Sequence, residues 1–121
     1  MSWYKITLPY TPDIDPKVVD IGDIAKACYA KENQPAGFGM FHATRGPNPL
    51  EHDTRLVYFS PVAYEVCREA IAEHYTLEPC DVPARDETGM IWVFGDPLVM
   101  GQLKDAYEPE TEETQKAQTA T

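Results

Sequence analysis

Basic residues, cysteines and long apolar runs are all scarce in this 121-residue chain, and each scarcity excludes a class of function. The chain has 10 Lys and Arg against 20 Asp and Glu, which gives a net charge of −10 at pH 7. Nucleic acids and anionic membranes are held by clustered Lys and Arg. We therefore expect direct binding to neither, and we interpret the acidic surface first as a source of solubility.

The three cysteines, Cys28, Cys67 and Cys80, form no C-x-x-C pair and are odd in number. This pattern predicts free thiols in a reducing compartment rather than a disulfide framework. No stretch reaches 18 consecutive apolar residues, and the first ten residues lack a basic segment followed by an apolar run. We expect a cytoplasmic protein, without a cofactor.

Motifs that would identify a chemistry are also missing. Ser60 lies in S-P-V-A-Y and not in a G-x-S-x-G turn, so the pattern does not predict a serine nucleophile. Gly37 and Gly39 are the only glycine pair that resembles a phosphate loop, but they open a strand rather than a helix. The sequence therefore predicts neither nucleophilic catalysis nor a phosphate loop.

The stretch from residue 38 to residue 75 contains the clearest structural signals. FGMFHATR (38–45) and RLVYFS (55–60) alternate with period two, which predicts two strands, and the loop 46–54 between them is rich in Gly and Pro. Ser60 and Pro61 then match the N-cap and first position of a helix. Apolar residues at three- and four-residue spacing follow, so this helix should cover the sheet.

The remaining elements extend this unit to an α+β fold. We predict a first strand over 3–8 and a helix beginning at Pro16 or, because of Gly22, only at Asp20. Residues 80–84 should form an edge strand or merely extended chain, and 90–94 a strand that is buried on both faces or closes against helices. A short last helix should follow Asp96. The order predicts a two-layer sandwich with ferredoxin-like β-α-β-β-α-β order, plus the extra strand and short helix. We predict a single domain over 1–107 and a disordered acidic tail over 108–121.

One face of the predicted sheet carries the two main helices, so the other face needs a cover. A second subunit would supply it in a homodimer, and the short C-terminal helix would supply it within the chain. The sequence does not choose between these two solutions.

Polar residues gather around the predicted hairpin, and we select five of them as a candidate binding site. They are His42, Arg45, Glu51, His52 and Asp53. Two histidines and two carboxylates can in principle hold a metal or perform acid/base chemistry. The H-x9-H spacing is not an established ligand pattern, so we predict no metal site and no catalytic residue here.

Two function hypotheses remain open. The first is a non-catalytic protein–protein interaction module whose acidic surface binds a basic partner, including the case of an inhibitor or regulator that occupies a nucleic-acid-binding groove. The alternative is a small dimeric enzyme or ligand-binding domain that uses His42, Arg45 and His52 beside a pocket lined by Trp3, Tyr58 and Trp92. A concave pocket with converging polar groups would favour the alternative.

Overall fold

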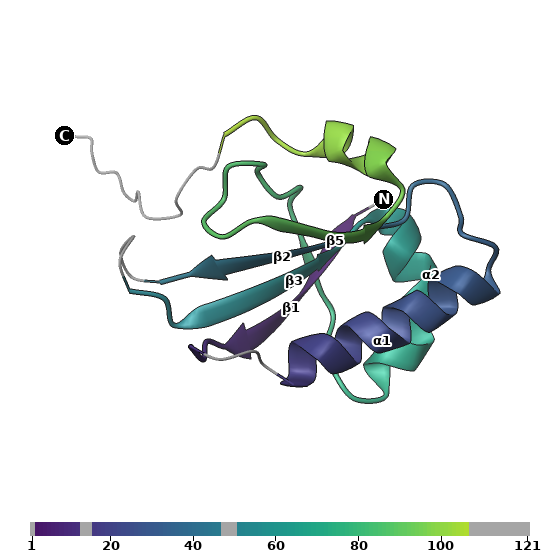
Figure 1. Cartoon of the computed structure of the whole chain (residues 1–121), viewed down its shortest axis with the longest axis horizontal. Helices are drawn as coiled ribbons and strands as arrows, with labels where there is room; N and C mark the ends of the chain where they lie inside the picture. The colour runs from purple at the N-terminus through teal and green to yellow at the C-terminus, as the bar shows by residue number, and fades with distance from the viewer. Residues whose placement is uncertain (1, 13–15, 47–50, 107–121) are drawn as a thin grey trace.

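The computed structural model describes residues 2–12, 16–46 and 51–106 (Figure 1). It contains an antiparallel sheet with two α-helices packed on it, which confirms the predicted α+β class. The elements in chain order are β1 (Trp3–Pro9), α1 (Pro16–Lys31), β2 (Gly39–Arg45), β3 (Thr54–Phe59), α2 (Pro61–Ala72), β4 (Glu78–Cys80), β5 (Ile91–Gly95) and the 3₁₀ helix η1 (Pro97–Gln102). The predicted tail over 108–121 lies outside the described residues.

The five strands form one sheet in the order β4-β1-β3-β2-β5, and every neighbouring pair is antiparallel. The predicted hairpin is β2 with β3, in a register that runs from Met40 opposite Phe59 to Arg45 opposite Thr54. β1 lies between β3 and β4. Side chains alternate between the two faces of a strand, so each strand contributes to two different environments.

Ser60 joins the hairpin to the helix that follows it. Its side chain is fully buried, and its hydroxyl oxygen accepts hydrogen bonds from the backbone N–H groups of Ala63 (3.3 Å) and Gly39 (2.9 Å). The hydroxyl group donates in turn to the carbonyl oxygen of Gly37 (2.6 Å). The predicted N-cap is therefore confirmed, and the same residue also fixes the start of β2 against α2.

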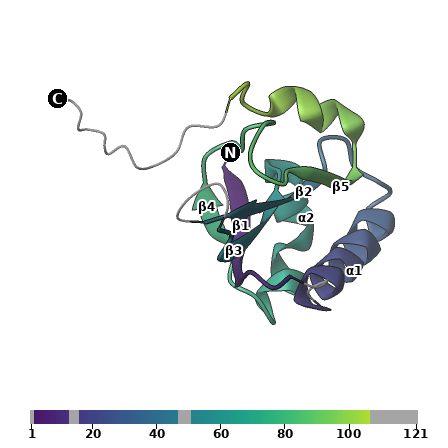
Figure 2. The ribbon, with the colours of Figure 1, turned by 60° about the vertical axis from the view of Figure 1, so that its left-hand side comes forward.

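The two α-helices cover one face of the sheet, which we call the helix face (Figure 2). Its buried core draws on all three central strands and both helices: Ile6, Leu8, Ile21, Ala25, Phe38, Met40, Val57, Phe59, Ala63, Cys67 and Ile71. α1 starts at Pro16, so the later start at Asp20 is wrong. Gly22 lies buried within α1, and tertiary packing of the helix overrides the weak helix propensity of glycine.

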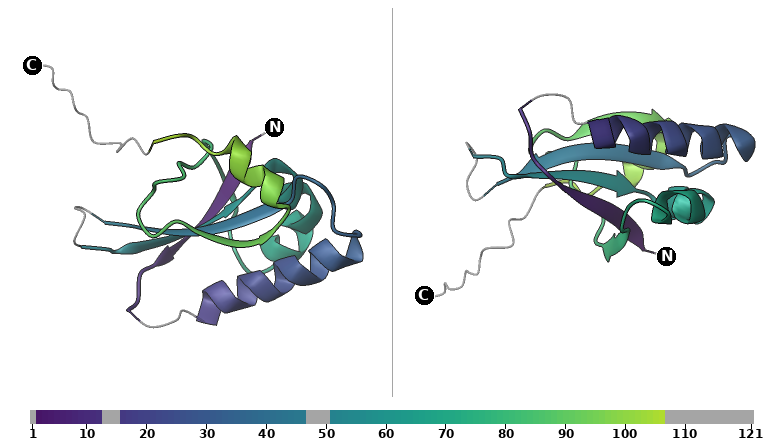
Figure 3. Two further views of the ribbon diagram at one scale, coloured as in Figure 1. Left: turned by 45° about the horizontal axis from the view of Figure 1, so that its top comes forward. Right: turned by 90° about the horizontal axis from the view of Figure 1, so that it is seen from below.

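The other face, which we call the open face, is covered by irregular chain. η1 lies across the strands there, as the left view of Figure 3 shows. A second buried cluster forms under it: Trp3, Phe41, Ala43, Leu56, Tyr58, Val99 and Leu103. A Cβ atom at Gly39 would lie 2.7 Å from Val99 Cγ1, so this glycine lets η1 approach the sheet. The predicted short helix thus covers part of this face within the chain.

Two predicted strands differ from the structure. β5 is not buried on both faces, because it is the edge strand beside β2, and its first residue, Ile91, is 58% exposed. An apolar run of five residues cannot by itself distinguish a central strand from an edge strand. β4 is at a sheet edge as predicted, but it comprises Glu78–Cys80 and ends before Pro83. None of the helices in the described ranges is long and apolar enough to cross a membrane.

Candidate functional site

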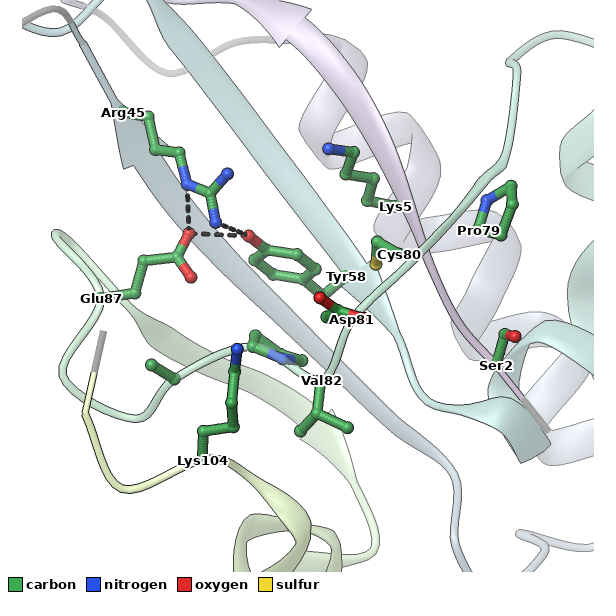
Figure 4. A pocket seen from close by; sticks show the side chains of 12 residues that line it. Ser2, Lys5, Arg45, Tyr58, Pro79, Cys80, Asp81, Val82, Glu87 and Lys104 are labelled. Carbon is green, nitrogen blue, oxygen red and sulfur yellow. Dashed lines mark hydrogen bonds and ion pairs between the residues drawn. The ribbon is translucent and has the colours of Figure 1, made fainter. Parts of the chain in front are cut away.

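A polar cavity of about 520 Å³ lies on the open face (Figure 4). β1, β2 and β3 form its floor, and the segment that connects β4 to β5 forms one wall together with Lys104. Its charged lining consists of Lys5, Arg45, Asp81, Glu87 and Lys104. Three of the ten basic side chains of an acidic protein therefore line one hollow together with two carboxylates.

Strand register places the floor residues. Lys5 lies directly opposite Tyr58 in the β1–β3 pair, and both side chains lie on the open face. The wall is held by backbone bonds of the chain after η1. Lys104 N–H donates to the Pro83 carbonyl oxygen (3.0 Å), and Arg85 N–H donates to the Lys104 carbonyl oxygen (3.0 Å). The wall is thus anchored on residues that lie about twenty positions further along the chain.

Arg45, Tyr58 and Glu87 form a hydrogen-bonded triad at the base of the cavity. Arg45 Nε donates to Glu87 Oε2 (2.9 Å), Arg45 Nη2 donates to the Tyr58 hydroxyl oxygen (2.8 Å), and the Tyr58 hydroxyl group donates to Glu87 Oε2 (2.7 Å). The Glu87 side chain is 1% exposed, against 28% for Arg45. Burial, and then the hydrogen bond to Glu87, raise the pKa of Tyr58, so this phenol remains a donor.

The second carboxylate oxygen of Glu87, Oε1, takes no part in the hydrogen bonds of the triad. Oε1 is buried and has no hydrogen-bond partner among the described residues, although Oε2 accepts two hydrogen bonds. A buried polar atom without a partner costs roughly 1–3 kcal/mol, and more when the group is charged. Such an atom in a native fold calls for a specific explanation.

Lys5, Lys104 and Asp81 complete the polar lining. No salt bridge within the described ranges involves any of these three side chains. Cys80 also lines the cavity, and burial is the main factor that raises its pKa to about 11. The Cys80 thiol is therefore protonated at neutral pH, which makes it a poor nucleophile.

The structure divides the five residues selected from the sequence between the two faces. Arg45 points into the cavity on the open face. His42 lies on the opposite side of β2, with its Nε2 atom 3.2 Å from Nη1 of Arg55. Burial, and then the charge of Arg55, lower the pKa of His42. Since Arg45 and His42 face opposite ways, they cannot contact the same small ligand.

Arg55 and Tyr10 lie between the two histidines and connect them only indirectly. The Arg55 guanidinium group lies 4.9 Å from the centre of the Tyr10 ring, and the His52 ring lies 5.5 Å from the same ring. Neither histidine lines the polar cavity. Glu51 and Asp53 are exposed at the end of the hairpin.

Of the three aromatic residues expected to line a pocket, only Tyr58 does so. Trp3 is 3% exposed and packs against Phe41 at 6.0 Å between ring centres, and Trp92 packs against the same ring at 5.1 Å. Trp3 thus belongs to the buried cluster beneath η1, and Trp92, which is partly buried, packs against this cluster. The aromatic pocket proposed from the sequence is in fact apolar core.

Four of the five charged residues of the cavity were not identified from the sequence as site residues, namely Lys5, Asp81, Glu87 and Lys104. Glu87 lies in the run Arg85 to Gly89, whose composition predicts only a turn. Nothing in that run distinguishes Glu87 from the exposed Asp86 beside it. Its role depends on contacts with Arg45 and Tyr58, which are 42 and 29 positions away.

Comparisons with protein-family models, with curated proteins and with solved structures found no significant match for this chain. In the part of the chain that the structure describes, no group of three His, Cys, Asp or Glu side chains is arranged to hold a metal ion. Function must therefore be argued from the cavity itself.

Proposed function

We propose that the protein binds a small polar molecule in the cavity of the open face. The observation that carries this proposal is the Glu87 carboxylate, which is buried and has one oxygen without a partner at the base of this hollow. A positively charged ligand group beside Glu87 would offset part of the cost of this unsatisfied buried carboxylate. The cavity volume of about 520 Å³ falls within the range of roughly 300–1,000 Å³ that is common for ligand sites.

The rigidity of the surroundings supports the same proposal. Arg45 and Tyr58 stand on neighbouring strands of the sheet and are fixed by hydrogen bonds to each other and to Glu87. Polar groups that are held in place before binding lose little entropy when a ligand arrives. The raised pKa values of Tyr58 and Cys80 leave neither group ionised at neutral pH, so the lining favours binding over nucleophilic catalysis.

For the fold we propose a ferredoxin-like arrangement with an added edge strand. The order β4-β1-β3-β2, with β1 and β3 adjacent in the centre and both helices on one face, supports this proposal. β5 then extends the sheet beside β2, and η1 returns over the open face. The cavity lies on the face that this arrangement leaves without an α-helix.

We keep a second proposal, a cytoplasmic protein–protein interaction module with a basic partner. It is supported by exposed apolar side chains at one edge of the sheet. Leu98 is 83% exposed, Ile91 58% and Met100 45%, and these apolar side chains lie on β5 and η1. Exposed apolar groups near an edge strand are typical of surfaces that pair with other proteins. The hairpin residues Glu51 and Asp53 remain candidates for contacts with a basic surface.

A thermal-shift screen of small polar metabolites on the full chain tests the first proposal. A ligand present at a 100-fold excess over its Kd should stabilise the protein by about 2.7 kcal/mol. We expect Lys5→Gln and Lys104→Gln to reduce the shift, because both side chains line the cavity. Lys31→Gln, at the end of α1 on the helix face, is the matched control and should leave it unchanged. A hit that all three variants bind equally well would contradict the proposal.

A further inference from the structure

The geometry points to a zwitterion as the ligand, that is, a small molecule of the α-amino acid class with an ammonium group on the side of Asp81 and Glu87 and a carboxylate between Lys5 and Lys104. This inference rests on the proposed function, because it specifies what the same cavity binds. It follows from the signs of the charges around the hollow and from which of them already have partners.

The acidic side of the cavity calls for a cationic donor. Glu87 Oε1 has no partner among the described residues, and Asp81 lines the same hollow without a salt bridge in those ranges. An ammonium group carries three N–H donors and a positive charge, and its hydrogen bonds to a carboxylate are about twice as strong as neutral ones. A ligand with only anionic groups would bring like charge to Glu87 and Asp81, which is destabilising.

The basic side of the cavity calls for an anion. In the view of Figure 4, Lys5 and Lys104 lie on either side of Tyr58. Neither ammonium group forms a salt bridge within the described part of the chain, and Arg45 adds a third positive charge at the base. A ligand with only cationic groups would be repelled by these three side chains. A carboxylate can accept hydrogen bonds from both lysines, and its negative charge is opposite to theirs.

The charges of the lining favour an amino acid over a nucleotide. Two carboxylates among three basic side chains leave the lining close to neutral, so several phosphate charges would not be balanced. In an α-amino acid the ammonium and carboxylate groups are bonded to the same carbon atom, so one small molecule brings both charges to the hollow. Val82 and Pro83 line the same hollow and can provide apolar contacts for its side chain.

Isothermal titration calorimetry of the full chain against the twenty standard α-amino acids tests the inference. For the amino acid that binds best, the corresponding amine without the carboxylate and the corresponding acid without the amine are titrated next. We expect at least one amino acid to bind and both analogues to bind at least tenfold more weakly. No amino acid binding, or an acid analogue that binds as tightly as its parent, would overturn the inference.

Charge variants separate this inference from the proposed function. Lys5→Gln and Lys104→Gln should weaken the amino acid and the acid analogue but not the amine analogue, whereas Asp81→Asn should weaken only the ligands with an ammonium group. All three side chains lie outside the buried triad, so the variants should fold. If another class of metabolite binds and depends on Lys5 and Lys104, the proposed function stands and the zwitterion inference fails. If no compound of any class binds, both fail.

Discussion

The two faces of the sheet differ in what covers them and in what they enclose. The helix face is sealed by α1 and α2 over eleven buried residues, all of them apolar or thiol side chains. The open face is covered by η1 and by the irregular segment between β4 and β5, and it encloses the Arg45, Tyr58 and Glu87 triad beside a cavity. The helix face stabilises the fold through continuous apolar packing. The open face also packs apolar side chains, but it contains in addition a group of buried polar side chains.

This difference indicates where binding can evolve in a small α+β protein. The layer between the helices and the sheet has no room for a ligand, because protein interiors are packed as densely as organic crystals. A face covered by irregular chain can retain a hollow, and its backbone bonds, such as that from Lys104 N–H to the Pro83 carbonyl oxygen, keep the walls in place. The predictions below test this division of roles.

The largest effect should come from the helix face. Ile71 is fully buried in the last turn of α2, so Ile71→Ala should lower the free energy of unfolding by about 2–4 kcal/mol through lost transfer energy and a residual cavity. Glu69→Ala, on the exposed side of the same helix, should change it by less than about 0.5 kcal/mol. Urea denaturation of both variants measures the difference. Equal small losses would show that α2 does not seal the core.

A somewhat smaller loss should follow from breaking the triad on the open face. Glu87→Gln removes the charge that accepts hydrogen bonds from Arg45 and Tyr58, and we expect a loss of roughly 1–3 kcal/mol because Arg45 is partly exposed. Thr88→Ala, at the exposed neighbour, is the control and should change the free energy of unfolding by under about 0.5 kcal/mol. An unchanged or raised stability in Glu87→Gln would mean that the triad does not stabilise the fold.

His42, on the helix-face side of β2, should make the free energy of unfolding depend on pH. Its pKa is lowered in the folded protein by burial and by Arg55, whereas in the unfolded chain it titrates near the ordinary value of about 6.5. The unfolded state therefore binds the proton first as the pH falls below about 6.5, and stability decreases until the folded form is protonated too. His42→Gln should show a smaller decrease between about pH 7 and about pH 5. The same decrease in both proteins would assign it to other groups.

The smallest effect is expected from the acidic end of the chain. Residues 108–121 include no aliphatic side chain larger than alanine, so their removal should lower the free energy of unfolding by less than about 0.5 kcal/mol. These residues lie outside the described ranges. Thermal unfolding of the chain shortened after Tyr107 provides the measurement, and a large fall in the melting temperature would show that this segment contributes to the fold.

Local sequence patterns, namely helix caps and apolar periodicity, were sufficient to predict the helix face but not the open face. Ser60 with Pro61 and Asp96 with Pro97 mark helix starts that the structure confirms, because capping depends on residues only a few positions apart. The helix face follows from apolar spacing in the same way. His42 and Arg45 were grouped because they are neighbours in sequence, but an odd separation along a strand places them on opposite faces.

The cavity could not be predicted because its residues come from distant parts of the sequence. Glu87 is brought to Arg45 and Tyr58 by a wall with no regular periodicity, and its partners are far away in sequence. In the sequence, Lys5 looks like any exposed polar residue of an alternating strand. Only the strand register shows that it lies opposite Tyr58. Sites of this kind become visible only when the sheet order and the course of the connecting chain are known.

Chemical-shift mapping of the amide groups tests most directly whether the open face is the binding face. An amino acid that binds in the calorimetric panel is titrated into ¹⁵N-labelled full-length protein. We expect the largest changes at Lys5, Arg45, Cys80, Glu87 and Lys104, and small changes over α1 and α2. Changes concentrated on the two α-helices, with the residues of the cavity unaffected, would contradict the assignment of binding to the open face.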